Sequence, residues 1–321
     1  MTKLDHKFCV APMMTHTDRH FRYFLRLLSR HVMLYTEMVT TGALIHGPAD
    51  KLMRYNPEEH PLAIQLGGSE PEALARCARM AAAAGYDEVN LNIGCPSDRV
   101  QSGKIGACLM AESELVAECV AAMAAVIGIP VTVKCRIGID ANDSYEALFN
   151  FVQLVAKGGC TTFIIHARKA CLQGLSPRQN REVPPLKYDF VHRIKRDFPE
   201  LEIIINGGIT AITQMQEQLQ NVDGVMIGRA ICNNPYFLSE IESTLYKQPQ
   251  TLLTRNAILE AYIEYVSKEL VTGSPLSYLT RNIIGMFHGR AGSRLYRRYL
   301  SENMYRRDSG IEVIRQALTY V

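Results

Sequence analysis

Short apolar runs rich in β-branched residues recur along the chain, and stretches with helical periodicity lie between most of them. A parallel strand that is covered on both faces has such an apolar run, and the helix after it has one apolar face. The pattern therefore predicts repeated βα units around a parallel sheet. Eight runs fit strands: residues 8–13, 32–38, 62–66, 88–93, 131–135, 162–166, 202–206 and 224–227.

The stretches between these runs fit amphipathic helices, although residues 40–61 are less regular. The predicted helices are residues 18–28, 71–84, 113–126, 144–156, 190–198 and 213–219. Strand and helix units of this number over about 240 residues have the size of a TIM (β/α)8 barrel. An open doubly wound sheet is the alternative, but no G-x-G-x-x-G follows the first strand, where dinucleotide-binding sheets carry it.

Strand patterns stop near residue 256, and only helical periodicity follows. The four stretches are residues 258–270, 276–287, 294–305 and 311–320. We therefore expect an α/β fold, a TIM barrel over residues 1–250, followed by a small C-terminal all-α helical domain over residues 251–321.

The composition is that of a globular protein, with 47% hydrophobic and 21% charged residues among 321. No apolar run could cross a bilayer and the first residues lack the apolar stretch of a signal peptide, so we expect a cytoplasmic protein without membrane association. The nine cysteines form no C-x-x-C pair, which argues against a zinc ribbon or an iron–sulfur cluster. We expect no metal, and a monomer.

The formal net charge is only +3, but the charge is unevenly distributed. Residues 281–307 contain seven arginines and one acidic residue, and residues 168–181 contain four basic residues and no acid. The rest of the chain is acidic. Two basic patches on an acidic body suit a polyanionic partner, although either patch alone fits a solvated helix face or loop equally well.

Polar residues and glycines gather where the predicted strands end. In a barrel, the carboxyl ends of the strands and the loops after them carry the functional residues. The residues at these positions are Pro12, Met13, Met14, Gln65, Asn92, Cys95, Lys134, His166, Asn206, Gly207, Gly208, Gly228 and Arg229.

Several of these residues favour a flavin that carries a phosphate. Gly-Gly at 207–208 and Gly-Arg at 228–229 follow the last two strands, where barrels commonly bind phosphate through backbone N–H groups. Lys134 lies in an apolar strand and needs an electron-rich partner, which the N1–C2=O edge of a reduced flavin supplies. Gln65 could hydrogen-bond the ring edge, and His166 could contact the ring or ribityl chain. Taken alone, a Gly-Gly pair after a strand is usually a turn, and His166 fits a hydrogen-bonded core histidine.

Cys95 follows the fourth predicted strand and precedes Pro96, which stiffens the loop. Such a position would hold the thiol over the end of the barrel. Since no metal pairing is available to it, the functional choices are a nucleophile or a proton donor. Its loop position distinguishes Cys95 from the other cysteines.

Six motifs together resemble the tRNA-dihydrouridine synthases, in order and over nearly the whole chain. They are Ala11-Pro12-Met13, LNIGCP at 91–96, Val133-Lys134, IHAR at 165–168, Asn206-Gly207-Gly208 and Gly228-Arg229. YTEMVTTGA at 35–43 and GLSP at 174–177 resemble the bacterial A-type subfamily in particular.

The resemblance implies an FMN-binding barrel that uses NADPH to reduce uridine in the D-loop of tRNA, at positions 20 and 20a for the A-type. It implies that the flavin delivers a hydride to C6 of uridine, that Cys95 protonates C5, and that Asn92 contacts the uridine. It assigns FMN binding to Pro12, Met13, Met14, Gln65, Lys134, His166, Asn206, Gly207, Gly208, Gly228 and Arg229. It assigns RNA contacts to Arg178, Arg181, Arg294 and Arg297.

Two alternatives share parts of this description. An FMN oxidoreductase that acts on a free pyrimidine would have the same barrel and flavin site, but it gives no reason for the arginine-rich C-terminal helices. A phosphate-binding barrel without redox chemistry, or an RNA-binding protein without catalysis, would be colourless when purified.

Overall fold

The computed structural model describes residues 4–97, 103–246 and 253–321. The chain forms two compact units. The first comprises Met1–Met14, Met33–Tyr55 and His60–Ile227, and the second comprises Thr15–Val32, Asn56–Glu59 and Gly228–Val321. The boundary expected between residues 250 and 251 lies outside the described residues.

Eight parallel strands form one sheet in the first unit, in the order β1-β8-β7-β6-β5-β4-β3-β2. Val10 N–H donates to Met33 O (2.9 Å) and Met33 N–H donates to Phe8 O (3.0 Å), which joins β1 to the residue just before β2 and closes the barrel. The predicted TIM barrel is therefore confirmed. The strands are β1 Phe8–Val10, β2 Leu34–Thr40, β3 Leu62–Gly67, β4 Glu88–Ile93, β5 Val131–Arg136, β6 Thr162–His166, β7 Glu202–Asn206 and β8 Gly224–Ile227.

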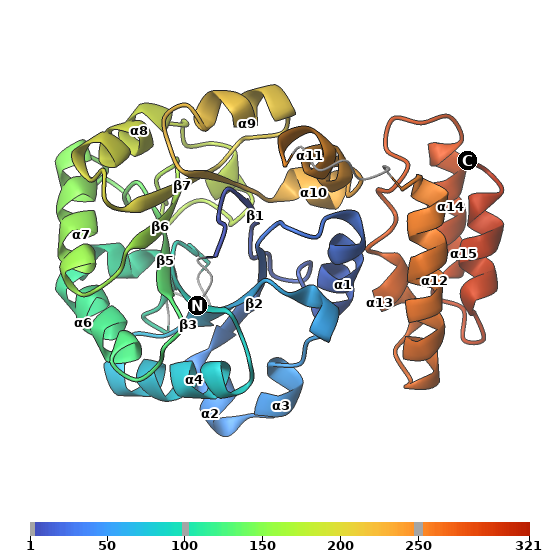
Figure 1. Cartoon of the computed structure of the whole chain (residues 1–321), viewed down its shortest axis with the longest axis horizontal. Coiled ribbons are helices and arrows are strands. Elements are labelled where there is room, and N and C mark those ends of the chain that lie inside the picture. Colours follow the sequence, from blue (N-terminus) through green and yellow to red (C-terminus); the bar gives the residue numbers. More distant parts are fainter. Residues whose placement is uncertain (1–3, 98–102, 247–252) are drawn as a thin grey trace. The chain divides into compact units, whose positions relative to one another are not determined.

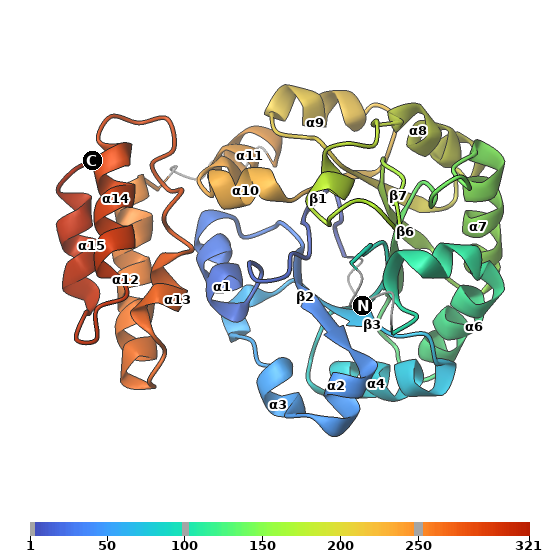
Figure 2. The same ribbon diagram turned by 180° about the vertical axis from the view of Figure 1, so that it is seen from behind.

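Helices surround the strands of this unit, as both views show (Figures 1 and 2). Local sequence accounts for several helix starts. The Ser144 side chain accepts Ala147 N–H (3.1 Å) at the start of the helix Tyr145–Lys157, and Pro71 occupies the first turn of the helix Pro71–Ala83. The helices are α2 Thr41–His46, α3 Ala49–Leu52, α4 Pro71–Ala83, α6 Ser113–Ala124, α7 Tyr145–Lys157, α8 Tyr188–Asp197 and α9 Ile212–Gln218. The 3₁₀ helices η2 Gly106–Ala111 and η3 Gln179–Arg181 lie in loops.

The strand predictions hold for most of the barrel, with differences near its start. β1 ends at Val10 instead of residue 13, because Pro12 has no N–H to continue the ladder. The irregular stretch at 40–61 contains the short helices α2 and α3. Thr40 starts α2 by accepting Ala43 N–H through its hydroxyl (3.3 Å).

The second unit is built of helices, in keeping with the helical region expected after the barrel. Its helices are α1 Arg19–Leu28, α10 Arg229–Asn233, α11 Phe237–Leu245, α12 Arg255–Val271, α13 Leu276–Thr280, α14 Ser293–Asn303 and α15 Ile311–Leu318, with η1 Pro57–Glu59. Among the described residues, no helix combines the length and the apolar character that crossing a membrane requires.

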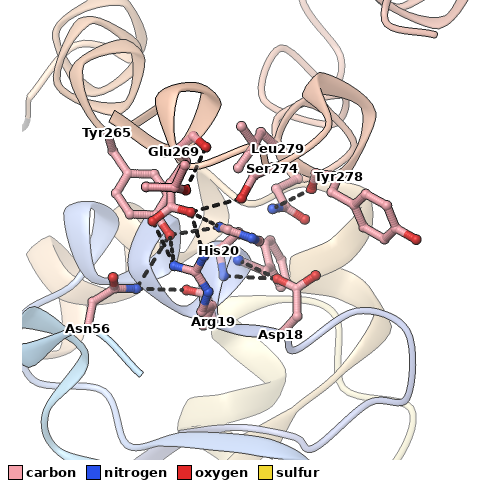
Figure 3. A network of polar contacts seen from close by, with 12 residues as sticks. Asp18, Arg19, His20, Asn56, Tyr265, Glu269, Ser274, Tyr278 and Leu279 are labelled. Atoms are coloured by element: carbon pink, nitrogen blue, oxygen red, sulfur yellow. Dashed lines mark hydrogen bonds and ion pairs between the residues drawn. The ribbon is translucent and has the colours of Figure 1, made fainter. Parts of the chain in front are cut away.

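Charged hydrogen bonds hold α1 against α12 within this unit (Figure 3). Arg19 Nη1 donates to Glu269 (2.7 Å), and Nη2 donates to the other oxygen of the same carboxylate. His20 Nδ1 lies 2.7 Å from the Tyr265 hydroxyl, and the Tyr23 and Tyr265 rings stack with centroids 3.9 Å apart. A helix that follows the first strand in sequence therefore shares a core with the C-terminal helices.

The helix expected over residues 276–287 is shorter than predicted, since α13 ends at Thr280. Hydrogen bonds of the i to i−3 type continue from there, such as Ile283 N–H to Thr280 O (3.1 Å). A Cβ on Gly285 would lie 2.6 Å from Asn233 O, so the backbone passes close to the end of α10. The residues directly after Thr280 therefore form successive turns and not a regular α-helix.

Candidate active site

Cys95 lies on a turn that is fixed by hydrogen bonds directly after β4. Asn92 Oδ1 accepts the backbone N–H groups of Gly94 (3.0 Å) and Cys95 (2.9 Å). The Cys95 carbonyl accepts Ala107 N–H (2.9 Å) from η2. The thiol is partly exposed, and its sulfur lies 3.5 Å from Ser97 Oγ. A partly accessible thiol is thus held at the carboxyl end of the strands, which we call the barrel mouth.

A row of hydrogen-bonded side chains runs from this turn into the barrel, and we call it the amide row. Asn92 Nδ2 donates to Gln65 Oε1 (2.8 Å), and Gln65 Nε2 donates to Asn90 Oδ1 (2.8 Å). Asn90 Nδ2 donates to Thr132 Oγ1 (2.8 Å), whose hydroxyl donates to Glu88 (2.6 Å). Because each member has a partner on both sides, the Gln65 and Asn92 amides have defined orientations.

The row ends at a buried histidine between two carboxylates. His6 Nε2 lies 2.6 Å from Glu88, and Nδ1 lies 3.0 Å from Glu202. Burial lowers the pKa of His6, but the hydrogen bonds and charges of Glu202 and Glu88 outweigh it and raise the pKa to about 10. The imidazole is therefore protonated at neutral pH and donates to both carboxylates.

Lys134 brings a cation to the barrel mouth from β5. Its ammonium donates to Asn206 Oδ1 (3.2 Å), and Asn206 Nδ2 donates to Met226 O (2.8 Å). Burial, followed by the charge of Arg136, lowers the pKa of Lys134 to about 8. An electron-rich ligand beside this ammonium would favour its charged form.

His166 and the glycine pair after β7 pack together closely. A Cβ on Gly207 would lie 2.6 Å from His166 Cδ2, and Gly207 has a φ of 119°. Gly208 has a φ of 71°, and the Tyr188 hydroxyl donates to Gly207 O (2.6 Å). Only glycine fits this backbone, which lies directly against the histidine ring.

Two polar residues in or beside the barrel mouth, Asn90 inside the barrel and Arg136 at the end of β5, were not predicted from the sequence. Asn90 is the central member of the amide row, and Arg136 is the last residue of β5, with only 3% of its surface exposed. Each is two residues from a residue that was singled out, Asn92 or Lys134. Since side chains on one face of a strand recur every second residue, this alternation is the pattern that would have found them.

The remaining residues expected to bind FMN lie directly after β1 and directly after β8. Pro12 and Met13 are half-buried, Met13 packs against the apolar layer that includes Cys9, and Met14 is 55% exposed. Gly228 and Arg229 begin the last segment of the second unit, and Arg229 is exposed. The roles of these residues remain predictions.

The arginines expected to contact RNA are all exposed. Arg178 and Arg181 lie on the loop after β6, where Arg178 pairs with Glu182 at 3.6 Å. Arg294 and Arg297 are on α14, one helical turn apart. Lys169 of the same loop instead contacts Asp140 O (2.8 Å) and Asp143 (3.4 Å), so it is held within the first unit.

Within the described ranges, no group of three or more histidine, cysteine, aspartate or glutamate side chains is arranged to hold a metal ion.

The chain matches one family model and several curated relatives over nearly its whole length. The family model described as dihydrouridine synthase matches residues 9–320. Proteins named tRNA-dihydrouridine(20/20a) synthase are 58% identical in Shewanella oneidensis, 54% in Vibrio vulnificus and 52% in Synechocystis sp.. The alignments cover 98%, 98% and 96% of this chain and 93%, 97% and 92% of those proteins, respectively.

A solved structure of a morphinone reductase mutant in complex with tetrahydroNAD is similar to the chain with a TM-score of 0.55 and 14% identity. The match covers 74% of this chain and 86% of that one, and it supports the barrel fold. The sequence matches extend over nearly the whole chain, and the chain therefore belongs to the dihydrouridine synthase family.

Proposed function

We propose that the protein reduces uridine to dihydrouridine in the D-loop of tRNA, at positions 20 and 20a, with bound FMN and with NADPH as the reductant. The observation that carries this proposal is the arrangement at the barrel mouth. There the Cys95 turn is fixed by Asn92, on the strand next to the one that carries Lys134. The names of the relatives, at more than half identity, support the same activity and position.

The residues at the barrel mouth fit a flavin mononucleotide. The Lys134 ammonium, with a lowered pKa, suits the electron-rich N1–C2=O edge of the ring, and Gln65 supplies an oriented amide. The backbone at 207–208 has no side chains to keep a phosphate or ribityl group away, and His166 lies beside it. When bound, FMN would supply hydride-transfer chemistry.

The chain's own residues would position the base and complete the proton transfer. Asn92 would contact the uracil ring while its Oδ1 holds the Cys95 turn. The Cys95 thiol would donate the proton that C5 of uracil gains. Since a base inside folded tRNA must leave its stack to be reduced, Arg178, Arg181, Arg294 and Arg297 would hold the RNA while one base enters the barrel mouth.

The direct test is to incubate the purified protein with NADPH and an unmodified tRNA transcript. Mass spectrometry of nuclease fragments should detect a gain of two hydrogens at positions 20 and 20a, and the protein should release FMN on denaturation. A protein that reduces free uridine as fast as tRNA would instead be a small-molecule oxidoreductase. A colourless protein without flavin would contradict the proposal altogether.

A matching experiment in cells would map dihydrouridine in tRNA from a strain that lacks this protein. Positions 20 and 20a should lose the modification and regain it when the gene is restored. Restoration with a Cys95→Ala variant serves as the control for catalysis, and it should leave both positions unmodified.

A further inference from the structure

Arg136 is a buried arginine that, within the part of the chain described, donates to three backbone carbonyls. Its Nε donates to Gly94 O (2.9 Å), and its Nη1 donates to Lys169 O (3.0 Å) and Asn180 O (3.0 Å). Burial, followed by the charges of Arg181 and Arg168, lowers its pKa to about 10, so the guanidinium stays charged at neutral pH. Burying a charge costs free energy unless hydrogen bonds compensate for the lost water, and here the three carbonyls provide them.

The first of these carbonyls belongs to the turn that carries Cys95. Asn92 holds the N–H groups of Gly94 and Cys95 from one side, and Arg136 holds the Gly94 carbonyl from the other. The peptide unit directly before the thiol is therefore fixed at both its donor and its acceptor.

The other two carbonyls belong to the loop after β6, which carries Arg178 and Arg181. Asn180 closes this loop: its Oδ1 accepts Cys171 N–H (2.7 Å), and its Nδ2 donates to Cys171 O (2.9 Å) and Leu175 O (3.1 Å). Asn180 is fully buried, whereas Arg178 is 81% exposed in its side chain. The guanidinium thus holds both ends of a closed loop, at Lys169 and Asn180, while Arg178 and Arg181 are exposed to solvent.

We propose that Arg136 is a positioning residue that fixes the Cys95 turn and the arginine-bearing loop after β6 in one arrangement. Arg136 would thereby set the distance between the Cys95 thiol and an RNA bound to the arginines of that loop. This inference rests on the proposed function. The role requires arginine, because a planar guanidinium directs several N–H groups at fixed angles, whereas a lysine ammonium offers a single point.

The decisive variant is Arg136→Lys, which keeps the positive charge and removes the fork of donors. We expect kcat for tRNA reduction to fall by about 10²-fold, as a misplacement of reacting groups by an ångström would cause. The rate at which NADPH reduces the bound flavin should stay at the unaltered value, because no flavin contact is removed. The matched control is Arg193→Lys, which changes a half-exposed arginine on α8 that pairs with Asp197.

Two readouts do not depend on turnover. Alkylation of Cys95 by iodoacetamide, followed by peptide mass spectrometry, should change severalfold in rate in Arg136→Lys. Trypsin should cleave after Arg178 and Arg181 faster than in the unaltered protein, because the loop has lost its attachment. Arg193→Lys should match the unaltered protein in both assays.

The proposal is overturned if Arg136→Lys keeps the unaltered kcat, or if Cys95 alkylates at the unaltered rate. A variant that melts at a lower temperature but has normal kcat in its folded form would also overturn it, since the role would then be structural only. If the unaltered protein forms no dihydrouridine in tRNA, the proposed function fails. The alkylation and trypsin assays would still decide whether Arg136 fixes the two segments.

Discussion

Cys95 differs from most other cysteines of the chain in the surroundings of its sulfur. Five of the nine cysteines are buried, and burial raises the pKa of Cys77 to about 11. Buried thiols of this kind pack as small apolar groups and neither reach a substrate nor exchange protons with it. Cys95 is partly exposed and sits on a turn held by Asn92 and Ala107.

Cys95→Ala should retain FMN and lose tRNA reduction by about 10²- to 10⁴-fold, the usual contribution of a positioned proton donor. The measurements are the flavin absorbance spectrum and the single-turnover rate of dihydrouridine formation. Cys108→Ala is the control, because Cys108 is also partly exposed but its Sγ lies 3.3 Å from Ile105 O. Full activity of Cys95→Ala would exclude this thiol as the acid.

Gly207→Ala should release FMN, because the added Cβ would lie 2.6 Å from His166 Cδ2 and would displace the histidine ring. Gly159→Ala is a matched control, since Gly159 has a φ of 103° and nothing within 4 Å of its Cβ position. Both variants should lose about 1–3 kcal/mol of stability from backbone strain, but only Gly207→Ala should lose the flavin. Equal FMN content in the two proteins, measured by fluorescence after denaturation, would count against a flavin at this glycine.

The strands were predictable from the sequence because each is a short apolar run, whereas part of the candidate site was not. Lys134 stood out as a charge inside an apolar run, but Arg136 lies at its end, where a charge is ordinary. What makes Arg136 unusual is its contact with carbonyls of residues 94, 169 and 180. Alternation with Lys134 could place Arg136 on the inner face of β5, but local periodicity does not show these long-range hydrogen bonds, because they depend on how the loops fold.

Buried charged hydrogen bonds join elements that are distant in the sequence, in each of the two units. In the barrel, the β1 segment, β4 and β7 are joined by the triad of His6, Glu88 and Glu202. In the second unit, α1 and α12 are joined by Arg19 and Glu269. Both contacts are charged hydrogen bonds with little solvent exposure, so their strength should depend on pH.

The unfolding free energy of the protein should decrease between pH 6.5 and 8 through His6. An unfolded histidine loses its proton near pH 6.5, whereas His6 in the folded protein keeps it up to about pH 10. The stabilisation is therefore complete below pH 6.5, and it declines by up to about 1.4 kcal/mol per pH unit above it. Urea unfolding across this range measures the slope, which His6→Gln should flatten. A stability that rises over the same window would contradict a protonated His6.

Glu269→Gln should destabilise the second unit by about 1.5–3 kcal/mol, the usual contribution of hydrogen bonds to a charged group. Burial raises the pKa of Glu269, but the hydrogen bonds and charge of Arg19 outweigh it and hold the pKa below its usual value. The contribution is thus present above pH about 4.5 and is lost as the pH falls. Glu260→Gln, an exposed residue of α12, is the control in thermal unfolding. Equal melting temperatures would show that the pair contributes nothing.

The membership of α1 in the helical unit is the part of the fold that the sequence could not predict. Its pattern over residues 18–28 indicated an amphipathic helix, which the structure has at Arg19–Leu28. Periodicity shows that one face is apolar but not which helix covers it. The covering residues, such as Tyr265 and Glu269, lie more than 200 residues later in the chain.

The whole chain combines a modest net charge with exposed arginines in both units. Arg178 and Arg181 belong to the first unit, whereas Arg294 and Arg297 belong to the second. Exposed guanidiniums that bind phosphate release counterions from RNA, so each contact steepens the dependence of binding on salt. For a polyanion that contacted arginines of both units, the salt dependence of binding would be the sum of the contributions from the two sets of arginines.

Arg294→Ala and Arg297→Ala should each weaken tRNA binding and lower the slope of log K against log salt by about one. Reduction of the flavin by NADPH should be unchanged, because it needs no RNA. Arg76→Ala, which removes an exposed arginine of α4, controls for net charge. A salt slope unchanged in the α14 variants, or lowered equally by Arg76→Ala, would rule out a specific contact at this helix.

The amide row has a direction, because it begins at two backbone N–H groups that can only donate and ends at carboxylates that accept from protonated His6. Donor and acceptor must alternate without a fault between these fixed ends. A change that removes a donor, such as Asn90→Asp, would set two acceptors face to face at Thr132, whose hydroxyl already donates to Glu88, while Gln65 could still donate to residue 90. We therefore expect a replacement that changes a donor into an acceptor in this row to be tolerated only with a second replacement that supplies the missing donor.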